Sequence, residues 1–252
     1  ITGQIIAGRE VYLTSWKGNV TNYDNIQSIN GEVVLENGYV YTLDDNNNTT
    51  LVNNIINTGS IMAKEDVLLR TFNGSIDNEA IIESEAASVT IEALKSKQCT
   101  GTSANEIGVI RNTGDAGSGN NADIMAAQNI TLNAAASIIN LGDFYANRGN
   151  IQVNAGDTIL NTGNYGIKEM GDITVISNGG DVLNMGHYYT KSGAIHMEAQ
   201  DDLVNMGVME SEKGDINLTS LNGSLYNEAG ADLLAGDGDI TLSAKSNKAG
   251  YY

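Results

Sequence analysis

A repeat of about 22 residues runs through the chain and constrains its fold more than any other feature. The clearest copies are short apolar bursts centred on isoleucine, each introduced by glycine or by a polar residue. These isoleucines follow one another at intervals of 21, 22, 22, 21 and 24 residues, as Ile130, Ile151, Ile173, Ile195, Ile216 and Ile240. Self-similarity at a fixed period of this length is typical of stacked structural units.

A second series lies about ten residues after the first within each repeat. Its members place asparagine after one or two apolar residues, commonly with glycine two positions later. The series contains Asn22, Asn57, Asn78, Asn112, Asn140, Asn161, Asn184, Asn205 and Asn227. Asparagines at one point of every unit can stack so that their amides hydrogen-bond along the stack, or they can occupy left-handed turn positions. Both interpretations make the series structural, not catalytic.

Each burst alternates apolar and polar residues, which is the periodicity of a strand with one buried face. Glycine, asparagine and aspartate bracket the bursts and suit tight turns. One unit of this size cannot bury its own apolar face, but a stack of such units can. The sequence therefore predicts an all-β, right-handed parallel β-helix as a single domain over residues 1–252. About ten coils, each adding roughly 4.8 Å, give a rod of about 50 Å.

The charge of the chain limits its partners. Thirteen Lys and Arg face 31 Asp and Glu, for a formal charge of -18, which disfavours nucleic acid and anionic membrane surfaces. No apolar run approaches the roughly 20 residues of a membrane span, so no membrane insertion is expected. The single Cys99 cannot form an internal disulfide, and the fold must rest on burial and hydrogen bonds.

Three places exceed the regular coil length, near residues 37–48, 94–104 and 115–121. A β-helix tolerates insertions at its corners, so these segments are expected to form protruding loops. If the protein binds a ligand, the first two loops are the predicted site. The candidate binding residues there are Asp44, Asp45, Asn46, Lys95 and Lys97.

The motifs that carry chemistry are weak. The acidic run that begins at Asp44 has oxygen donors for calcium but lacks the spacing of a known calcium loop, so a solvated turn is preferred and calcium is the alternative. His187 and His196 are the only histidines and have no cysteine nearby, which predicts no metal site. No phosphate-binding loop or nucleophile elbow is present, and no cofactor is expected.

An enzyme is not expected, because the carboxylates are abundant but form no recognisable constellation. The alternative is a carbohydrate-active β-helix enzyme, either a polysaccharide lyase or a glycoside hydrolase. Several tyrosines could grip a sugar or peptide, although shielding of the corners of the rod is the preferred interpretation. These tyrosines are Tyr12, Tyr23, Tyr39, Tyr41, Tyr145, Tyr165, Tyr188 and Tyr189.

Two tracts carry a family resemblance. The run from Gly171 to Val175, followed by the run from Val182 to Gly186, is repeated as Gly214 to Leu218. These tracts resemble the haemagglutinin-type repeats of the filamentous haemagglutinin family. The similarity is clearest over residues 123–246 and looser before them.

The resemblance implies a β-helical shaft of a large exoprotein exported through an outer-membrane transporter by two-partner secretion. It further implies a location outside the cell or on the bacterial surface, and a role in adhesion or in contact-dependent delivery of a toxin. The expected partner is a receptor or glycan on a host cell or a neighbouring bacterium. A passive spacer without a ligand is the remaining alternative. The chain contains no proline, so the Asn-Pro-rich signatures of the family's secretion domain are absent from it.

Overall fold

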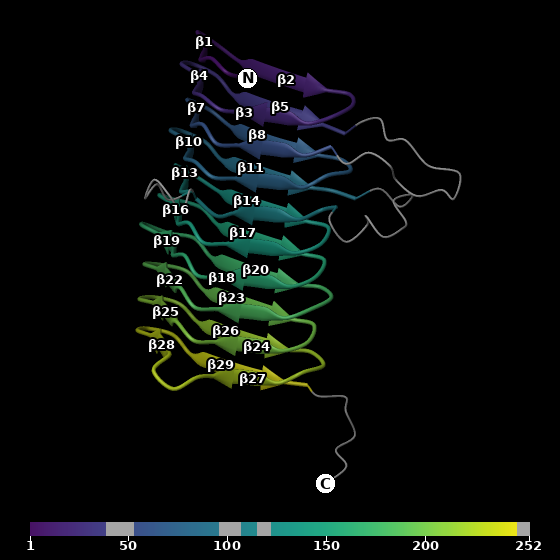
Figure 1. The fold of residues 1–252 in the computed structure, drawn as a ribbon. Coiled ribbons are helices and arrows are strands. Elements are labelled where there is room, and N and C mark those ends of the chain that lie inside the picture. The colour runs from purple at the N-terminus through teal and green to yellow at the C-terminus, as the bar shows by residue number, and fades with distance from the viewer. Residues whose placement is uncertain (39–52, 96–106, 115–121, 246–252) are drawn as a thin grey trace, which may run out of the picture.

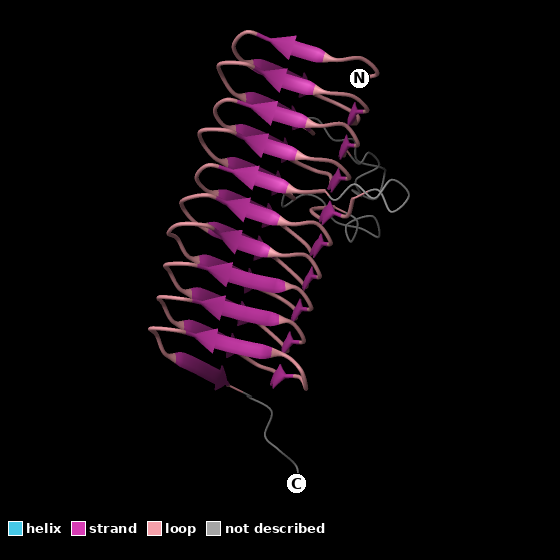
Figure 2. Ribbon diagram, turned by 90° about the vertical axis from the view of Figure 1, so that its left-hand side faces the viewer, coloured by secondary structure: helices cyan, strands magenta, loops and turns pink. Residues whose placement is uncertain are grey.

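The computed structural model describes residues 1–38, 53–95, 107–114 and 122–245. In these residues the protein is all-β, with 29 strands and no helix, and the strands stack along one axis (Figures 1 and 2). Every strand pairing is parallel. No helix capable of spanning a membrane occurs in the part of the chain that is described.

The strands form three parallel sheets, here called sheets A, B and C. Sheet A contains β1 (Ile5–Ala7), β4 (Ile26–Ser28), β7 (Ile61–Ala63), β10 (Ile82–Ser84), β13 (Ile124–Ala126), β16 (Phe144–Ala146), β19 (Tyr165–Ile167), β22 (His187–Thr190), β25 (Val208–Ser211) and β28 (Asp232–Ala235). Sheet B contains β2 (Val11–Ser15), β5 (Val33–Asn37), β8 (Val67–Thr71), β11 (Val89–Ala93), β14 (Ile130–Ala134), β17 (Ile151–Ala155), β20 (Ile173–Ser177), β23 (Ile195–Ala199), β26 (Ile216–Ser220) and β29 (Ile240–Ala244). Sheet C contains β3 (Val20–Asn22), β6 (Ile55–Asn57), β9 (Ile76–Asn78), β12 (Ile110–Asn112), β15 (Ile138–Asn140), β18 (Ile159–Asn161), β21 (Val182–Asn184), β24 (Leu203–Asn205) and β27 (Leu225–Asn227).

Each coil contributes one strand to each sheet in the order A, B, C. Nine coils are complete, and β28 and β29 supply two strands of a further coil. The pairing is in register: Ile130 of β14 lies beside Ile151 of β17, which lies beside Ile173 of β20. The predicted parallel β-helix with coils of about 22 residues is confirmed.

The core is a set of columns of inward-facing side chains. In β14 the inward residues Ile130, Leu132 and Ala134 are buried, while Thr131 and Asn133 between them are only half-buried. This buried and half-buried alternation recurs in most coils because successive side chains of a strand point to opposite faces. The isoleucines of the sequence repeat are thus the residues that stack on their equivalents above and below.

Aromatic side chains replace isoleucine in part of one core column. Phe144 and Tyr165 stack with ring centroids 4.6 Å apart, and Tyr165 meets Tyr188 edge-on, also at 4.6 Å. Burial raises the pKa of both tyrosine hydroxyls above the ordinary value. For Tyr165 and Tyr188, both the ligand-gripping and the corner-shielding interpretations are therefore wrong. They occupy the inward positions that Ile82 and Ile124 hold in earlier coils of the same sheet.

The first two expected insertions fall at equivalent corners, between β5 and β6 and between β11 and β12. Asn37 is the last residue of β5, so the extra length of that coil begins after it. The third insertion falls between β12 and β13, at the corner from sheet C to sheet A. Most of the three segments lies outside the described residues, namely residues 39–48, 96–104 and 115–121.

A column of glycines lets the coils approach closely at the corner after sheet C. A Cβ atom at Gly163 would overlap the carbonyl oxygen of Gly142, and one at Gly186 would overlap that of Gly163. Gly207 stands in the same relation to Gly186. The glycines that follow Asn140, Asn161, Asn184 and Asn205 are therefore favoured by close backbone contact between coils.

Candidate functional site

The nine asparagines of the repeat form a continuous ladder through the stack. In each step the Nδ2 group of one asparagine donates to the Oδ1 atom of the next, and the eight bonds measure 2.7–3.1 Å. The first eight asparagines are buried, whereas Asn227 is exposed. Of the two arrangements considered from the sequence, the structure contains the stacked one.

In eight of the nine asparagines, the side-chain amide also donates to a backbone carbonyl. Asn140 donates to the carbonyl of Gly142 at 2.7 Å, and Asn161 donates to that of Gly163 at 2.8 Å. Burial of these polar side chains is therefore offset, because the Nδ2 donors and the Oδ1 acceptor of the amide are hydrogen-bonded. These asparagines are committed to holding the coils together.

Aspartate and asparagine residues form similar bonds at the corners. The Oδ1 atom of Asn150 accepts the backbone N–H of Asp172 at 2.9 Å, and Asp172 in turn accepts the N–H of Ala194 at 2.8 Å. Asp215 accepts the N–H of Asp239 in the same way, at 2.9 Å. The aspartates of the repeated Gly-Asp-Ile motif thus bind the backbone of the next coil.

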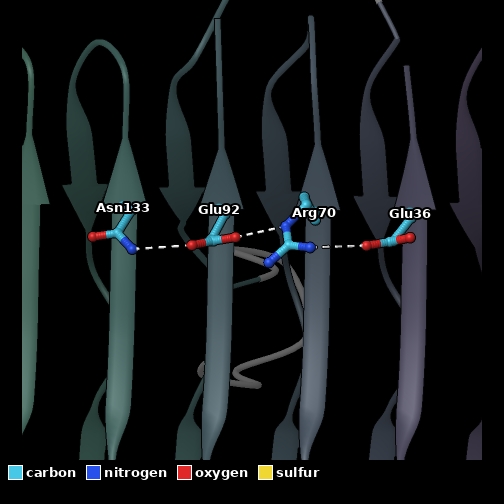
Figure 3. Close-up of polar contacts among 4 residues, drawn as sticks. All are labelled: Glu36, Arg70, Glu92 and Asn133. Carbon is cyan, nitrogen blue, oxygen red and sulfur yellow. Dashed lines mark hydrogen bonds and ion pairs between the residues drawn. The ribbon is translucent and has the colours of Figure 1, made fainter. Parts of the chain in front are cut away.

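A row of paired charged side chains lies on the outer face of sheet B (Figure 3). Arg70 of β8 is between Glu36 of β5 and Glu92 of β11, with N···O distances of 3.1 and 2.6 Å. Glu92 also accepts a hydrogen bond of 3.2 Å from Asn133. Partial burial lowers the pKa of Arg70, but hydrogen bonds and charge from Glu92 and Glu36 outweigh it and raise that pKa. This arrangement, the Arg70 ladder, ties four coils together.

We expect Arg70→Gln to lower the free energy of unfolding by about 1 kcal/mol at low salt, because two half-buried carboxylates lose their cation. The difference from the parent protein should shrink in about 1 M salt, which screens the ion pairs. Denaturant titrations at both salt concentrations measure this. Arg148→Gln is the matched control, since Arg148 pairs with Glu169 in a much more exposed position, with 64% and 42% of the two side chains exposed. Equal effects of the two substitutions would contradict the prediction.

The candidate binding residues from the sequence are only partly placed by the structure. Lys95 forms an isolated antiparallel bridge with Asn73, beside the end of β11. Asp44, Asp45, Asn46 and Lys97 lie outside the described residues, so their predicted role stays a prediction. Within the described ranges, no group of three or more His, Cys, Asp or Glu side chains could hold a metal ion.

A groove of about 540 Å³ lies on the outer face of sheet A and was not found from the sequence. Its floor and walls include Met125, Tyr145, Gly166 and Tyr189, which come from the successive strands β13, β16, β19 and β22. These residues occupy one outward row, so the groove runs along the stack axis. Its size falls within the range of pockets that hold small ligands. We call it the tyrosine groove.

Hydrogen bonds fix the tyrosines of the tyrosine groove. Tyr145 donates its hydroxyl to Asp143 at 3.0 Å, and Tyr189 donates to Glu212 at 2.6 Å. The hydrogen bond to Glu212, with a smaller contribution from burial, raises the pKa of Tyr189 to about 12. The residues of this site are about 20 positions apart in sequence, so only an alignment of all coils in their correct register could have revealed the row.

No protein-family model, curated protein or solved structure matches the chain. The geometry itself shows a parallel β-solenoid whose recurring polar side chains bond one coil to the next. It is a fold compatible with a haemagglutinin-type shaft and with a rod-like structural role.

Proposed function

We propose that the chain is a rod-like segment of a secreted bacterial surface protein, an adhesin or a contact-dependent toxin-delivery filament, that carries recognition elements along its length. The proposed partner is a receptor or glycan on a host or neighbouring bacterial cell. Export through an outer-membrane transporter belongs to the same proposal, and so does the absence of catalysis.

The asparagine ladder is the observation that carries the proposal. It continues through all nine complete coils, although the chain between consecutive asparagines varies from 21 to 35 residues. A stack whose axial bonds are this regular resists bending and separation, because each coil is held by two neighbours in the same way. Rigidity combined with variable corners is what a protein needs to hold binding elements away from a cell surface.

The chemistry of the repeat supports this role. In many enzymes, several carboxylates converge on the substrate. Here the recurring aspartates bind backbone N–H groups, and the arginines of the Arg70 ladder and of β12 pair with carboxylates of adjacent coils. The repeated polar residues thus support the stack itself.

Binding of the purified chain to intact bacterial and epithelial cells tests the proposal. Two variants shorten the insertions by removing residues 39–52 or 96–106, and a third removes the whole coil Ile61–Ile81, which joins Ser60 to Ile82 in register. We expect the coil deletion to fold, to be shorter by about 5 Å and to retain cell binding. Loss of binding is expected in at least one loop variant. A folded parent chain that binds neither cell type would contradict the proposed recognition role.

A further inference from the structure

The tyrosine groove has the shape of a binding site because of one small residue. Outward positions of neighbouring coils are about 4.8 Å apart, so Tyr145 and Tyr189 stand about 9.6 Å apart with Gly166 between them. A Cβ atom at Gly166 would lie only 3.0 and 3.2 Å from two ring carbons of Tyr145. The Tyr145 ring therefore lies against the Gly166 backbone, and the space between Gly166 and the Tyr189 ring stays open.

The tyrosine rings are held in place before any ligand arrives. Turning either ring away from the groove would break its hydrogen bond to Asp143 or Glu212. A prearranged aromatic surface binds with a smaller loss of conformational entropy than a mobile one. Met125 continues the apolar lining by one further coil.

The lining of the tyrosine groove carries charges of both signs, and the carboxylates of Asp143 and Glu212 that hold its tyrosines add negative charge beside it. Glu83 and Lys168 line it with opposite signs, and Glu85 is paired with Lys64 at 3.0 Å. These surroundings disfavour an anionic ligand, and the overall charge of -18 opposes polyanions further. An amide, a carboxylate and an ammonium group at the margins can nevertheless hydrogen-bond to hydroxyl groups.

The backbone at the groove excludes one common mode of recognition. Strands β16, β19 and β22 are each paired on both sides, so their N–H and C=O groups cannot accept an added peptide strand. A ligand must bind through the side chains of the outer face. It should present an apolar ring face to each tyrosine and hydroxyl groups to the polar margin.

From this combination we infer that the tyrosine groove binds a short, uncharged oligosaccharide lying along the stack axis. Pyranose rings have apolar faces that pack on aromatic rings and hydroxyl edges that meet amide and charged groups. The inference rests on the proposed recognition function and names the ligand class and the site. It adds a recognition site on the regular coils to the recognition proposed for the inserted loops.

Binding of the parent chain to a panel of neutral oligosaccharides, followed by calorimetry on those that bind, tests the inference. We expect Tyr189→Ala to weaken binding about tenfold or more and Gly166→Leu to abolish it by filling the open space. Gly166 does not have a positive φ, so its backbone accepts leucine, whose Cβ would also displace the Tyr145 ring that lies against it. The matched control is Tyr12→Ala, which removes another exposed tyrosine hydrogen-bonded to a glutamate, Glu32, on sheet B. It should leave the affinity unchanged.

Circular dichroism and denaturation midpoints of each variant establish that it is folded. The inference fails if no neutral oligosaccharide binds the parent chain, or if folded Gly166→Leu and Tyr189→Ala bind as the parent does. It also fails if a proline-rich peptide or an anionic glycan occupies the groove instead. Loop-dependent cell binding by a chain whose groove binds no neutral oligosaccharide would overturn this inference while leaving the proposed function intact.

Discussion

Replacing Asn161 by alanine is expected to lower the free energy of unfolding by about 3–5 kcal/mol. The substitution removes the acceptor of Asn140 and the donor to Asn184, and it leaves the Gly163 carbonyl without its side-chain partner. Each buried polar group that loses its partner costs about 1–3 kcal/mol, because no water replaces the lost bond. The shift of the denaturation midpoint, followed by circular dichroism, measures the effect.

Asn154→Ala provides the comparison for Asn161→Ala. Asn154 also donates to an asparagine of the preceding coil, Asn133, at 3.1 Å, but it lies on the partly exposed outer face of sheet B. Water can replace that bond, so the loss should be within about 0.5 kcal/mol. If the two substitutions cost the same, the interior ladder is not a special source of stability.

Gly163→Ala is expected to destabilise the protein by about 3 kcal/mol although it adds only one methyl group. The new Cβ would overlap the backbone carbonyl oxygen of Gly142 and lie 3.1 Å from the side-chain Nδ2 atom of Asn140. The clash is with backbone, so relief requires the two coils to move apart, which strains the parallel hydrogen bonds on either side. Thermal or denaturant unfolding of the variant measures the loss.

Gly8→Ala is the control for the glycine substitution. A Cβ atom at Gly8 would meet no other atom within 4 Å, and its backbone does not have a positive φ. Reduced freedom of the unfolded chain should make that variant neutral or slightly more stable. A Gly163→Ala protein as stable as Gly8→Ala would show that the coils can separate without cost.

The sequence was sufficient for the architecture because the inward residues recur at nearly constant spacing. Ile130, Ile151 and Ile173 alone define a coil length, and alternation within each burst defines which residues face inward. The asparagine series predicted a common structural role, but it could not decide between stacking and turn formation. That choice depends on whether the side chain points into the coil, which residue type does not reveal.

Features that depend on which residues face one another across coils were harder to predict. Tyr165 and Tyr188 belong to the core because their coils place aromatic residues where others place isoleucine. Arg70 is one of thirteen Lys and Arg residues in the sequence, yet it lies between glutamates of the coils before and after its own. The tyrosine groove depends on the gap at Gly166, which is informative only after its neighbours in the row are known.

The uneven spacing of the asparagine ladder has an evolutionary consequence. Asn22 and Asn57 are separated by 35 residues and Asn140 and Asn161 by 21, yet their hydrogen bonds measure 2.9 and 2.8 Å. The hydrogen bonds between coils are therefore unaffected by the length of chain at a corner. Mutation can lengthen, replace or exchange corner segments without selection having to repair the rest of the molecule. Lineages carrying such a scaffold can diversify what they display while inheriting the same interior.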